Sequence, residues 1–134
     1  MVKMAKNSTI RITIESGYDQ WWRYNVYVSA ATFADGERVD YRSVCDVVYP
    51  LGNGSEVRLR PEGWNPARPI VLEIDAAQSL ELFAYVIPNT MPIDNSIRQS
   101  PPFPIRLKIT GAGLNISEDH KVNQWGGLSL HGTY

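Results

Sequence analysis

The sequence predicts an all-β protein, built as a single-domain antiparallel β-sandwich of about eight to ten strands. Three observations support this prediction. Apolar and polar residues alternate in short segments, turn-forming residues recur about every eight to twelve positions, and no segment repeats apolar residues at helical spacing. A length of 134 residues is that of one domain, so residues 1–134 are expected to fold as one unit.

The first predicted strand covers Thr9–Glu15, where three isoleucines alternate with polar residues. Residues 16–19 form a turn that leads into a second strand. This strand is followed by Asp35-Gly36, a pair that supplies the positive φ angles of a tight hairpin turn. Residues 37–44 are therefore expected to fold back and pair antiparallel with the strand that precedes them.

The second strand, residues 21–30, carries most of the aromatic side chains near the N-terminus. With a period of two, Trp22 falls on the inward face, together with Tyr24. Trp21 and Tyr27 fall on the outward face. The sequence thus predicts a core position for Trp22 and an exposed position for Trp21.

The middle of the chain alternates short strands with loops. Residues 44–49 and 56–60 are expected to be strands, and the loop 61–69 holds three prolines with Trp64 at its centre. Five prolines mark a long irregular excursion at 88–104, a length typical of functional or interface loops. Further strands are predicted at 70–74, 79–87, 105–110, 114–117 and 122–130, with a turn at 118–121.

Composition narrows the classes of partner. Thirteen basic and fourteen acidic residues are well mixed and give a formal net charge of −1, so nucleic acid is not an expected partner. The first residues lack the apolar run of a signal peptide, and Cys45 has no second cysteine with which to pair. Synthesis in a reducing cytoplasm is therefore expected.

Residues with catalytic or metal-binding chemistry are sparse. His120 and His131 do not have the spacing of a zinc site, and the aspartates lie mostly beside turns, where their side chains bond nearby amides. Cys45 lies in an apolar strand and is expected to be buried and inert. We therefore expect no metal, no cofactor and no enzymatic activity.

Exposed aromatic rings are the best candidates for ligand contacts, because they bind sugars, membrane interfaces and protein surfaces. The candidates are Trp21, Tyr18, Tyr27 and Trp64. Outward cations form a second set. They would make a cationic face for phosphate headgroups or carboxylates if their strands were neighbours, and otherwise they are simply solvated; they are Arg58, Arg60, Arg106 and Lys108.

The layout of the chain resembles that of the aegerolysins, a family of small β-sandwich proteins. The likeness lies in the Ile-X-Ile-X-Ile strand at 10–14, the hairpin at 34–37, the aromatic strand at 82–85 before a Pro/Asn loop, and a glycine-bearing C-terminal end. The resemblance implies a protein that recognises membrane lipids after release. It also implies a larger partner protein with which it forms pores, as in two-component cytolytic or insecticidal toxins.

Three functions follow as hypotheses. The first is a membrane-recognition module with Trp21, Tyr27 and Trp64 as contacts. The second is a structural or assembly module of a larger complex, docked through the excursion at 88–104 and an exposed sheet edge. The third is a lectin-like domain that uses the same aromatic residues against glycans. A homo-oligomer is compatible with each of them.

Overall fold

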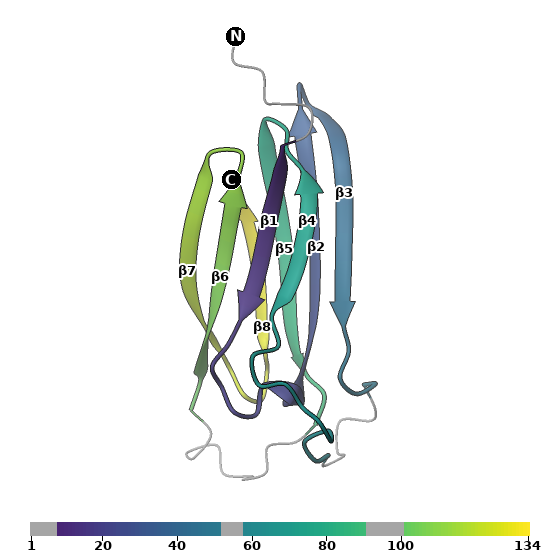
Figure 1. Cartoon of the computed structure of the whole chain (residues 1–134), viewed down its shortest axis with the longest axis vertical. Coiled ribbons are helices and arrows are strands. Elements are labelled where there is room, and N and C mark those ends of the chain that lie inside the picture. Colours follow the sequence, from purple (N-terminus) through teal and green to yellow (C-terminus); the bar gives the residue numbers. More distant parts are fainter. Residues whose placement is uncertain (1–7, 52–57, 91–100) are drawn as a thin grey trace.

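Two antiparallel sheets of four strands each pack face to face in the computed structural model (Figure 1), which describes residues 8–51, 58–90 and 101–134. The strand order is β4-β1-β6-β7 in the first sheet and β3-β2-β5-β8 in the second. The predicted all-β sandwich is confirmed. The first sheet consists of β1 (Thr9–Glu15), β4 (Ile70–Asp75), β6 (Phe103–Gly111) and β7 (Leu114–Val122). The second consists of β2 (Tyr24–Ala34), β3 (Glu37–Asp46), β5 (Ser79–Pro88) and β8 (Leu128–Thr133).

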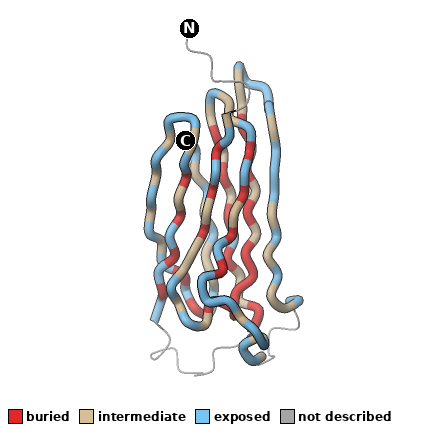
Figure 2. The backbone as a smooth tube through the Cα atoms, viewed as in Figure 1, coloured by how far each residue is buried: buried red, intermediate tan, exposed pale blue. Residues whose placement is uncertain are grey.

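The core lies between the two sheets and follows the predicted alternation (Figure 2). In β1, Ile10, Ile12 and Ile14 are all buried, and every second residue of β5 and β6 is buried in the same way. Because successive side chains of a strand point to opposite faces, each sheet contributes one apolar face to this core. The opposite faces of both sheets remain in contact with solvent.

The hairpin between β2 and β3 forms at the predicted turn. Asp35 has a φ angle of 52° and Gly36 a φ angle of 78°, the positive values that a two-residue hairpin of this kind requires. The register between the two strands shifts once, between Thr32 and Phe33. The result is a long strand pair in which β2 lies between β3 and β5.

The aromatic strand begins later than predicted. Trp21–Arg23 form a single 3₁₀ turn, η1, and strand β2 begins at Tyr24. Backbone hydrogen bonds from Trp21 N to Tyr18 O and from Arg23 N to Gln20 O close this turn. The period of two therefore does not apply to residues 21–23, and the predicted outward position of Trp21 is wrong.

The last two strands also differ from the prediction. Residues 118–121 continue β7 instead of forming a turn, because they pair with β6 as far as Phe103↔Val122. An edge strand accepts charged residues that would be costly in the middle of a sheet. The turn lies at residues 123–127, closed by the bridge Asn123↔Gly127, and β8 begins at Leu128.

Two predicted segments lie partly outside the described residues. Of the predicted strand 56–60, residues 58–60 are described and are not in a strand. Of the excursion 88–104, residues 91–100 lie outside the described part, while β5 extends to Pro88 and β6 begins at Phe103. The apolar run predicted at 44–49 is not a separate strand, since β3 continues through Asp46.

Candidate functional site

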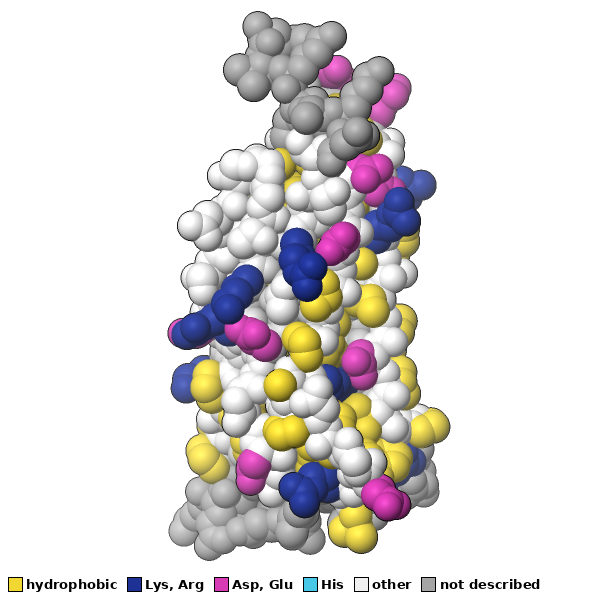
Figure 3. All heavy atoms as spheres, in the orientation of Figure 1, with side chains coloured by type: hydrophobic (Ala, Val, Ile, Leu, Met, Phe, Trp, Pro, Cys, Tyr) yellow, Lys and Arg dark blue, Asp and Glu magenta, His cyan; other side chains and the backbone are white. Residues whose placement is uncertain are grey.

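The outer face of the first sheet carries charges that pair with each other (Figure 3). Arg11 Nη1 lies 2.9 Å from Glu73 Oε1, Lys108 Nζ lies 2.8 Å from Glu15 Oε1, and Arg106 Nε lies 3.0 Å from Asp119 Oδ1. The pairing with Asp119 raises the pKa of Arg106 further above its ordinary value. This face is therefore polar and solvated.

The four predicted cations do not share a surface. Arg106 and Lys108 lie on β6 and are each paired with a carboxylate. Arg58 and Arg60 follow the second sheet, outside any strand, and the Arg58 guanidinium lies 5.0 Å from the centre of the Tyr49 ring. The cationic face proposed for these four residues does not form, because their segments are not neighbours.

The outer face of the second sheet has a different composition. Tyr27 of β2 pairs with Tyr85 of β5 and with Cys45 of β3, and the next row places Ser29 beside Phe83. We call this surface the tyrosine-rich face. It consists of Tyr27, Ser29, Tyr41, Ser43, Cys45, Phe83, Tyr85, Ser129 and His131.

The tyrosine-rich face is accessible and nearly uncharged. Tyr85 is 43% exposed and Tyr41 is 51% exposed. The Phe83 ring stacks on His131 with a centroid distance of 4.2 Å and an interplanar angle of 6°. Two charged side chains accompany this face: Glu81, whose Oε1 lies 3.2 Å from His131 Nε2, and Arg38, whose guanidinium lies 5.6 Å from the centre of the Tyr41 ring.

The exposed large apolar side chains come from the second sheet and from the segment that follows β3. Among the described residues, the large hydrophobic side chains that are exposed all belong to β3, to the segment after it, or to β5, and none belongs to the first sheet. They are Val39, Tyr41, Val47, Leu51, Leu59 and Tyr85. The two outer faces thus differ in proportion: the first carries three ion pairs of Lys or Arg with a carboxylate, and the second carries mainly aromatic and hydroxyl groups beside the Glu81–His131 pair.

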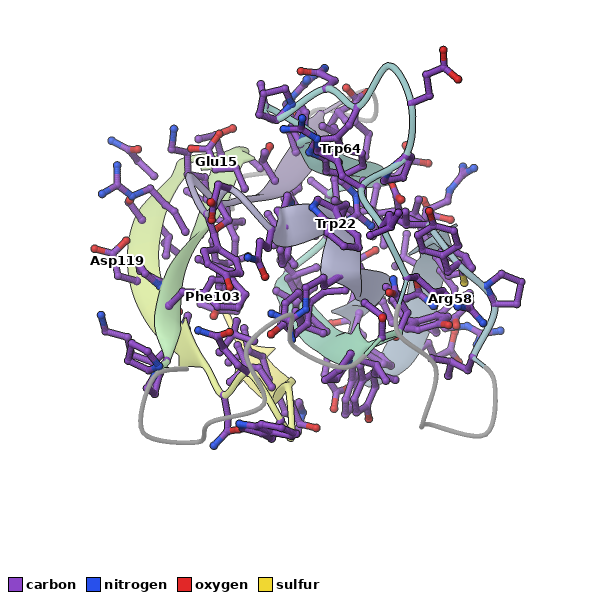
Figure 4. The ribbon with its side chains drawn as sticks, turned by 90° about the horizontal axis from the view of Figure 1, so that it is seen from below. Glu15, Trp22, Arg58, Trp64, Phe103 and Asp119 are labelled. Atoms are coloured by element: carbon purple, nitrogen blue, oxygen red, sulfur yellow. The ribbon has the colours of Figure 1, made fainter. Side chains whose placement is uncertain are left out.

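The predicted site residues are dispersed over three environments. Trp21 is fully buried, and its ring lies 6.0 Å from Phe103 in the core. Tyr18 is half-buried and stacks on Phe103 at 4.2 Å. Trp64 is half-buried in the loop before β4, at the lower end of the sandwich (Figure 4). Of the four aromatic candidates, Tyr27 alone lies on the tyrosine-rich face.

Two other positions are worth comparing with the prediction. Trp22 is 2% exposed, which confirms its predicted burial. Cys45 is exposed, so the prediction of a buried thiol is wrong. The physical reason is that Cys45 pairs with Tyr27 on the outward phase of β3, an edge strand with no layer over this face.

Sequence reasoning did not select Phe83 and Tyr85 as site residues. Their strand partner was not known, and a row of aromatic residues is visible only when β2 and β5 are placed side by side. The sequence pattern could have indicated this pair, because Tyr27 and Tyr85 both fall on the outward side of long strands that are rich in aromatic residues.

The lower end of the sandwich holds two buried arginines. The guanidinium of Arg68 lies between two tryptophans, 5.2 Å from the ring centre of Trp21 and 5.6 Å from that of Trp64. Its Nη2 lies 2.7 Å from Asp46 Oδ1, and its Nη1 donates to the backbone oxygens of Trp21 and Tyr24.

Arg23 is the second buried arginine, with no measurable exposure. Its Nη1 donates to three neutral oxygens, those of Tyr18, Gln20 and Gln124, at 3.0 to 3.3 Å. Burial raises the pKa of Tyr18 and that of Tyr24 above their usual value, and Arg23 opposes this shift in both cases. The Arg23 guanidinium also lies 5.3 Å from the centre of the Tyr24 ring, and both Tyr18 and Tyr24 contact the ring of Phe103.

The described residues do not assemble a metal-binding group. No three His, Cys, Asp or Glu side chains within the described ranges lie close enough to share a metal ion. A cleft of about 430 Å³ beside β6 is lined by Glu15, Arg106 and Asp119, whose charges are already paired. No helix in the described part of the chain is long and apolar enough to cross a membrane.

Comparisons with known proteins identify no relative: no family model, no curated protein and no solved structure matches this chain. The aegerolysin resemblance therefore stays a prediction.

Proposed function

We propose that this protein is a non-enzymatic recognition module that binds a partner protein through its tyrosine-rich face. The observation that carries the proposal is the contrast between the two outer faces. The first sheet exposes paired charges, whereas the second exposes tyrosine, phenylalanine and serine with few charges. A row of exposed aromatic rings and hydroxyl groups with few charges is typical of a surface that contacts another molecule.

The composition of this face is typical of protein-binding surfaces. Tyrosine and phenylalanine are enriched at interfaces, and charged residues are depleted at their centres. Tyrosine also supplies a large contact area at a low cost in conformational entropy, while serine supplies adaptable hydrogen bonds. Tyr27, Tyr41 and Tyr85, interleaved with Ser29 and Ser43, have this pattern.

The size of the face suits a partner protein. Four strands spaced about 4.8 Å apart and about 30 Å long give a surface of roughly 500–600 Å². A standard interface takes about 800 Å² from each partner.

Membrane binding has less support from these positions. The membrane hypothesis named Trp21, Tyr27 and Trp64 as contacts, and Trp21 is fully buried while Trp64 covers Arg68. Of the three named contacts, Tyr27 remains, and a single aromatic ring supports only about millimolar binding. Glycans would use the same rings as a protein partner, and the experiment below separates the two.

The proposal is tested by gel filtration of a tagged protein in extracts of the cells that produce it. The wild type is expected to elute in a complex, and the variant Tyr41→Ser/Tyr85→Ser as a monomer, because loss of the two most exposed rings of the face weakens binding at least about tenfold. The control Arg11→Ser/Thr110→Ser alters the first sheet and should elute like the wild type.

Other outcomes would contradict the proposal. If the purified wild type sediments with liposomes, or binds a glycan array, and the double tyrosine variant does not, the face recognises lipid or sugar instead. If the purified wild type is itself a dimer that the tyrosine variant breaks, the partner protein is a second copy of this chain. A wild type that is monomeric in every extract would remove the support for a partner protein.

A further inference from the structure

Arg23 has one side of its guanidinium without hydrogen-bond partners. Nη1 is saturated, since three oxygens surround its two protons. Nε and Nη2 are buried and make no hydrogen bond. Among the described residues, no carboxylate lies within ion-pair distance of this group. A guanidinium cannot lose its proton in a protein, so the charge stays in place.

Arg68 shows how the same fold treats an equivalent group. Its Nη1 also donates to neutral oxygens, the carbonyls of Trp21 and Tyr24. Its Nε and Nη2, however, both donate to Asp46 Oδ1, at 3.2 and 2.7 Å. The two buried arginines at this end of the sandwich therefore differ in one respect: the Nε–Nη2 edge of Arg68 holds a carboxylate, and that of Arg23 does not.

The open edge has a defined chemical preference. Nε–H and one Nη2–H of a guanidinium point in the same direction and match the two oxygens of a carboxylate. A buried charge without a counter-charge is costly, and a carboxylate at this edge removes much of that cost. We propose that the Nε–Nη2 edge of Arg23 is a binding site for a carboxylate supplied from outside the described structure of this chain.

The site is enclosed, so a carboxylate reaches it when the end of the sandwich opens locally. Tyr18 and Gln124 accept hydrogen bonds from Nη1 and so fix the plane of the guanidinium. They thereby set the direction in which the unpaired Nε–Nη2 edge points. Two sources share this chemistry: a small free carboxylate, and an acidic side chain of a bound protein. The site is independent of the tyrosine-rich face and does not require that the proposed function be correct.

The test observes the arginine Nε–H resonances of the ¹⁵N-labelled full chain by NMR. Sodium acetate is titrated at constant ionic strength against sodium chloride. The Arg23 resonance, identified by its loss in Arg23→Lys, is expected to shift saturably with acetate, with half-saturation in the millimolar range, and not with chloride. The Arg68 resonance is the internal control and should not move, because Asp46 occupies its edge.

A second titration uses N-acetyl-aspartate amide, which presents an acidic side chain as a protein would. A shift with both probes supports a partner's side chain as the source, and a shift with acetate alone supports a small free carboxylate. If the Arg23 resonance fails to move with either probe, or moves equally with chloride, the proposal is overturned. If Arg23→Lys does not fold, the Arg23 Nε–H resonance of the wild type is assigned through its backbone connectivities instead, and the same titrations are carried out.

Discussion

Arg68 and Asp46 join the two sheets at the lower end of the sandwich. Asp46 is the last residue of β3, and Arg68 lies in the loop that leads into β4. Arg68 Nη2 lies 2.7 Å from Asp46 Oδ1 and 3.0 Å from the backbone oxygen of Asp46. Because the Arg68 side chain is only 7% exposed, this pair is expected to contribute to stability.

The substitution Asp46→Ala is expected to lower the free energy of unfolding by about 2–3 kcal/mol, as measured by urea denaturation. The loss arises because Arg68 keeps its charge in a buried position without a counter-charge. Since Asp46 is 38% exposed, the loss should be smaller than the ~3–5 kcal/mol of a fully enclosed pair. A loss below about 1 kcal/mol would show that water solvates the charge of Arg68 when Asp46 is removed, and would contradict this expectation.

The matched control is the pair Arg11–Glu73 on the first sheet. Both side chains are more than half exposed, and their closest atoms are 2.9 Å apart. Glu73→Ala is expected to change the free energy of unfolding by about 0.5 kcal/mol or less, because solvent screens exposed ion pairs. Equal effects at Asp46 and Glu73 would contradict the assignment of Arg68 as a buried charge.

Stability at low pH should depend on Asp40. The backbone N–H of Asp75 donates to Asp40 Oδ2 at 3.0 Å and holds the pKa of Asp40 below its ordinary value of 3.8, with Arg42 and the N–H of Tyr41 adding to the shift. A lowered pKa stabilises the fold at a pH above the unfolded value. This contribution is lost as the pH falls through the folded pKa.

Asp40→Asn is therefore expected to flatten the decrease in the free energy of unfolding between about pH 5 and pH 2. The measurement is urea denaturation at a series of pH values. If wild type and variant lose stability in parallel over this range, Asp40 is not a source of the acid sensitivity.

Stability at high pH should depend on the buried tyrosines. Burial raises the pKa of Tyr24 above its usual value of 10.0, and its hydroxyl donates to the backbone oxygen of Gln124 at 3.2 Å. The unfolded chain ionises this group near its ordinary pKa, while the folded chain keeps the proton. The free energy of unfolding is thus unaffected below about pH 10 and falls as the pH rises further.

Tyr24→Phe should reduce this alkaline slope, while at neutral pH it costs about 1 kcal/mol for the lost hydrogen bond. Denaturation at about pH 7 measures the cost of the lost hydrogen bond, and a series between about pH 9 and pH 12 measures the slope. An unchanged slope in the Tyr24 variant would contradict this account of its burial.

Gly127 closes the turn between β7 and β8 and should not tolerate a side chain. Its φ angle is +76°, and a Cβ atom there would overlap the backbone oxygen of Val86. Gly127→Ala is expected to lower the free energy of unfolding by more than about 2 kcal/mol. Gly63→Ala is the control, since Gly63 has a φ of +70° but open space around it, and should cost only about 1 kcal/mol.

Much of the fold was predictable because the evidence is local. The alternation of Ile10, Ile12 and Ile14 fixes which face of β1 is buried, and Asp35-Gly36 fixes a hairpin whose turn needs positive φ angles. The prediction for Trp21 failed because a short 3₁₀ turn replaces the start of the predicted strand. Three residues at Trp21–Arg23 form a 3₁₀ turn, and this changes the direction of Trp21 without any change in the apolar pattern.

The site was less predictable because it depends on contacts that are distant in sequence. Tyr27 was selected from its outward phase, but Tyr85 became its neighbour, and Tyr41 came to share its face, only through the order β3-β2-β5. The burial of Arg23 and Arg68 has the same origin. Gln124 and Asp46, which lie far from these arginines in the sequence, supply the oxygens that accept their protons.

The tyrosine-rich face should be dispensable for folding. Tyr85→Ser and Tyr41→Ser replace side chains that are 43% and 51% exposed, so each is expected to change the free energy of unfolding by about 1 kcal/mol or less. Thermal and urea denaturation measure this change. A large loss of stability would show that these rings stabilise the sheet itself and would remove the need for a partner.

The most direct test of the proposed function places a photo-cross-linking residue, p-benzoylphenylalanine, at Tyr85 and, as the control, at Thr110 on the opposite face. Cells that produce each variant are irradiated, and covalent adducts are separated by size. The account predicts one discrete protein adduct from position 85 and none from position 110, because the partner covers the tyrosine-rich face. Equal adducts from both positions, or an adduct from position 110 alone, would contradict it.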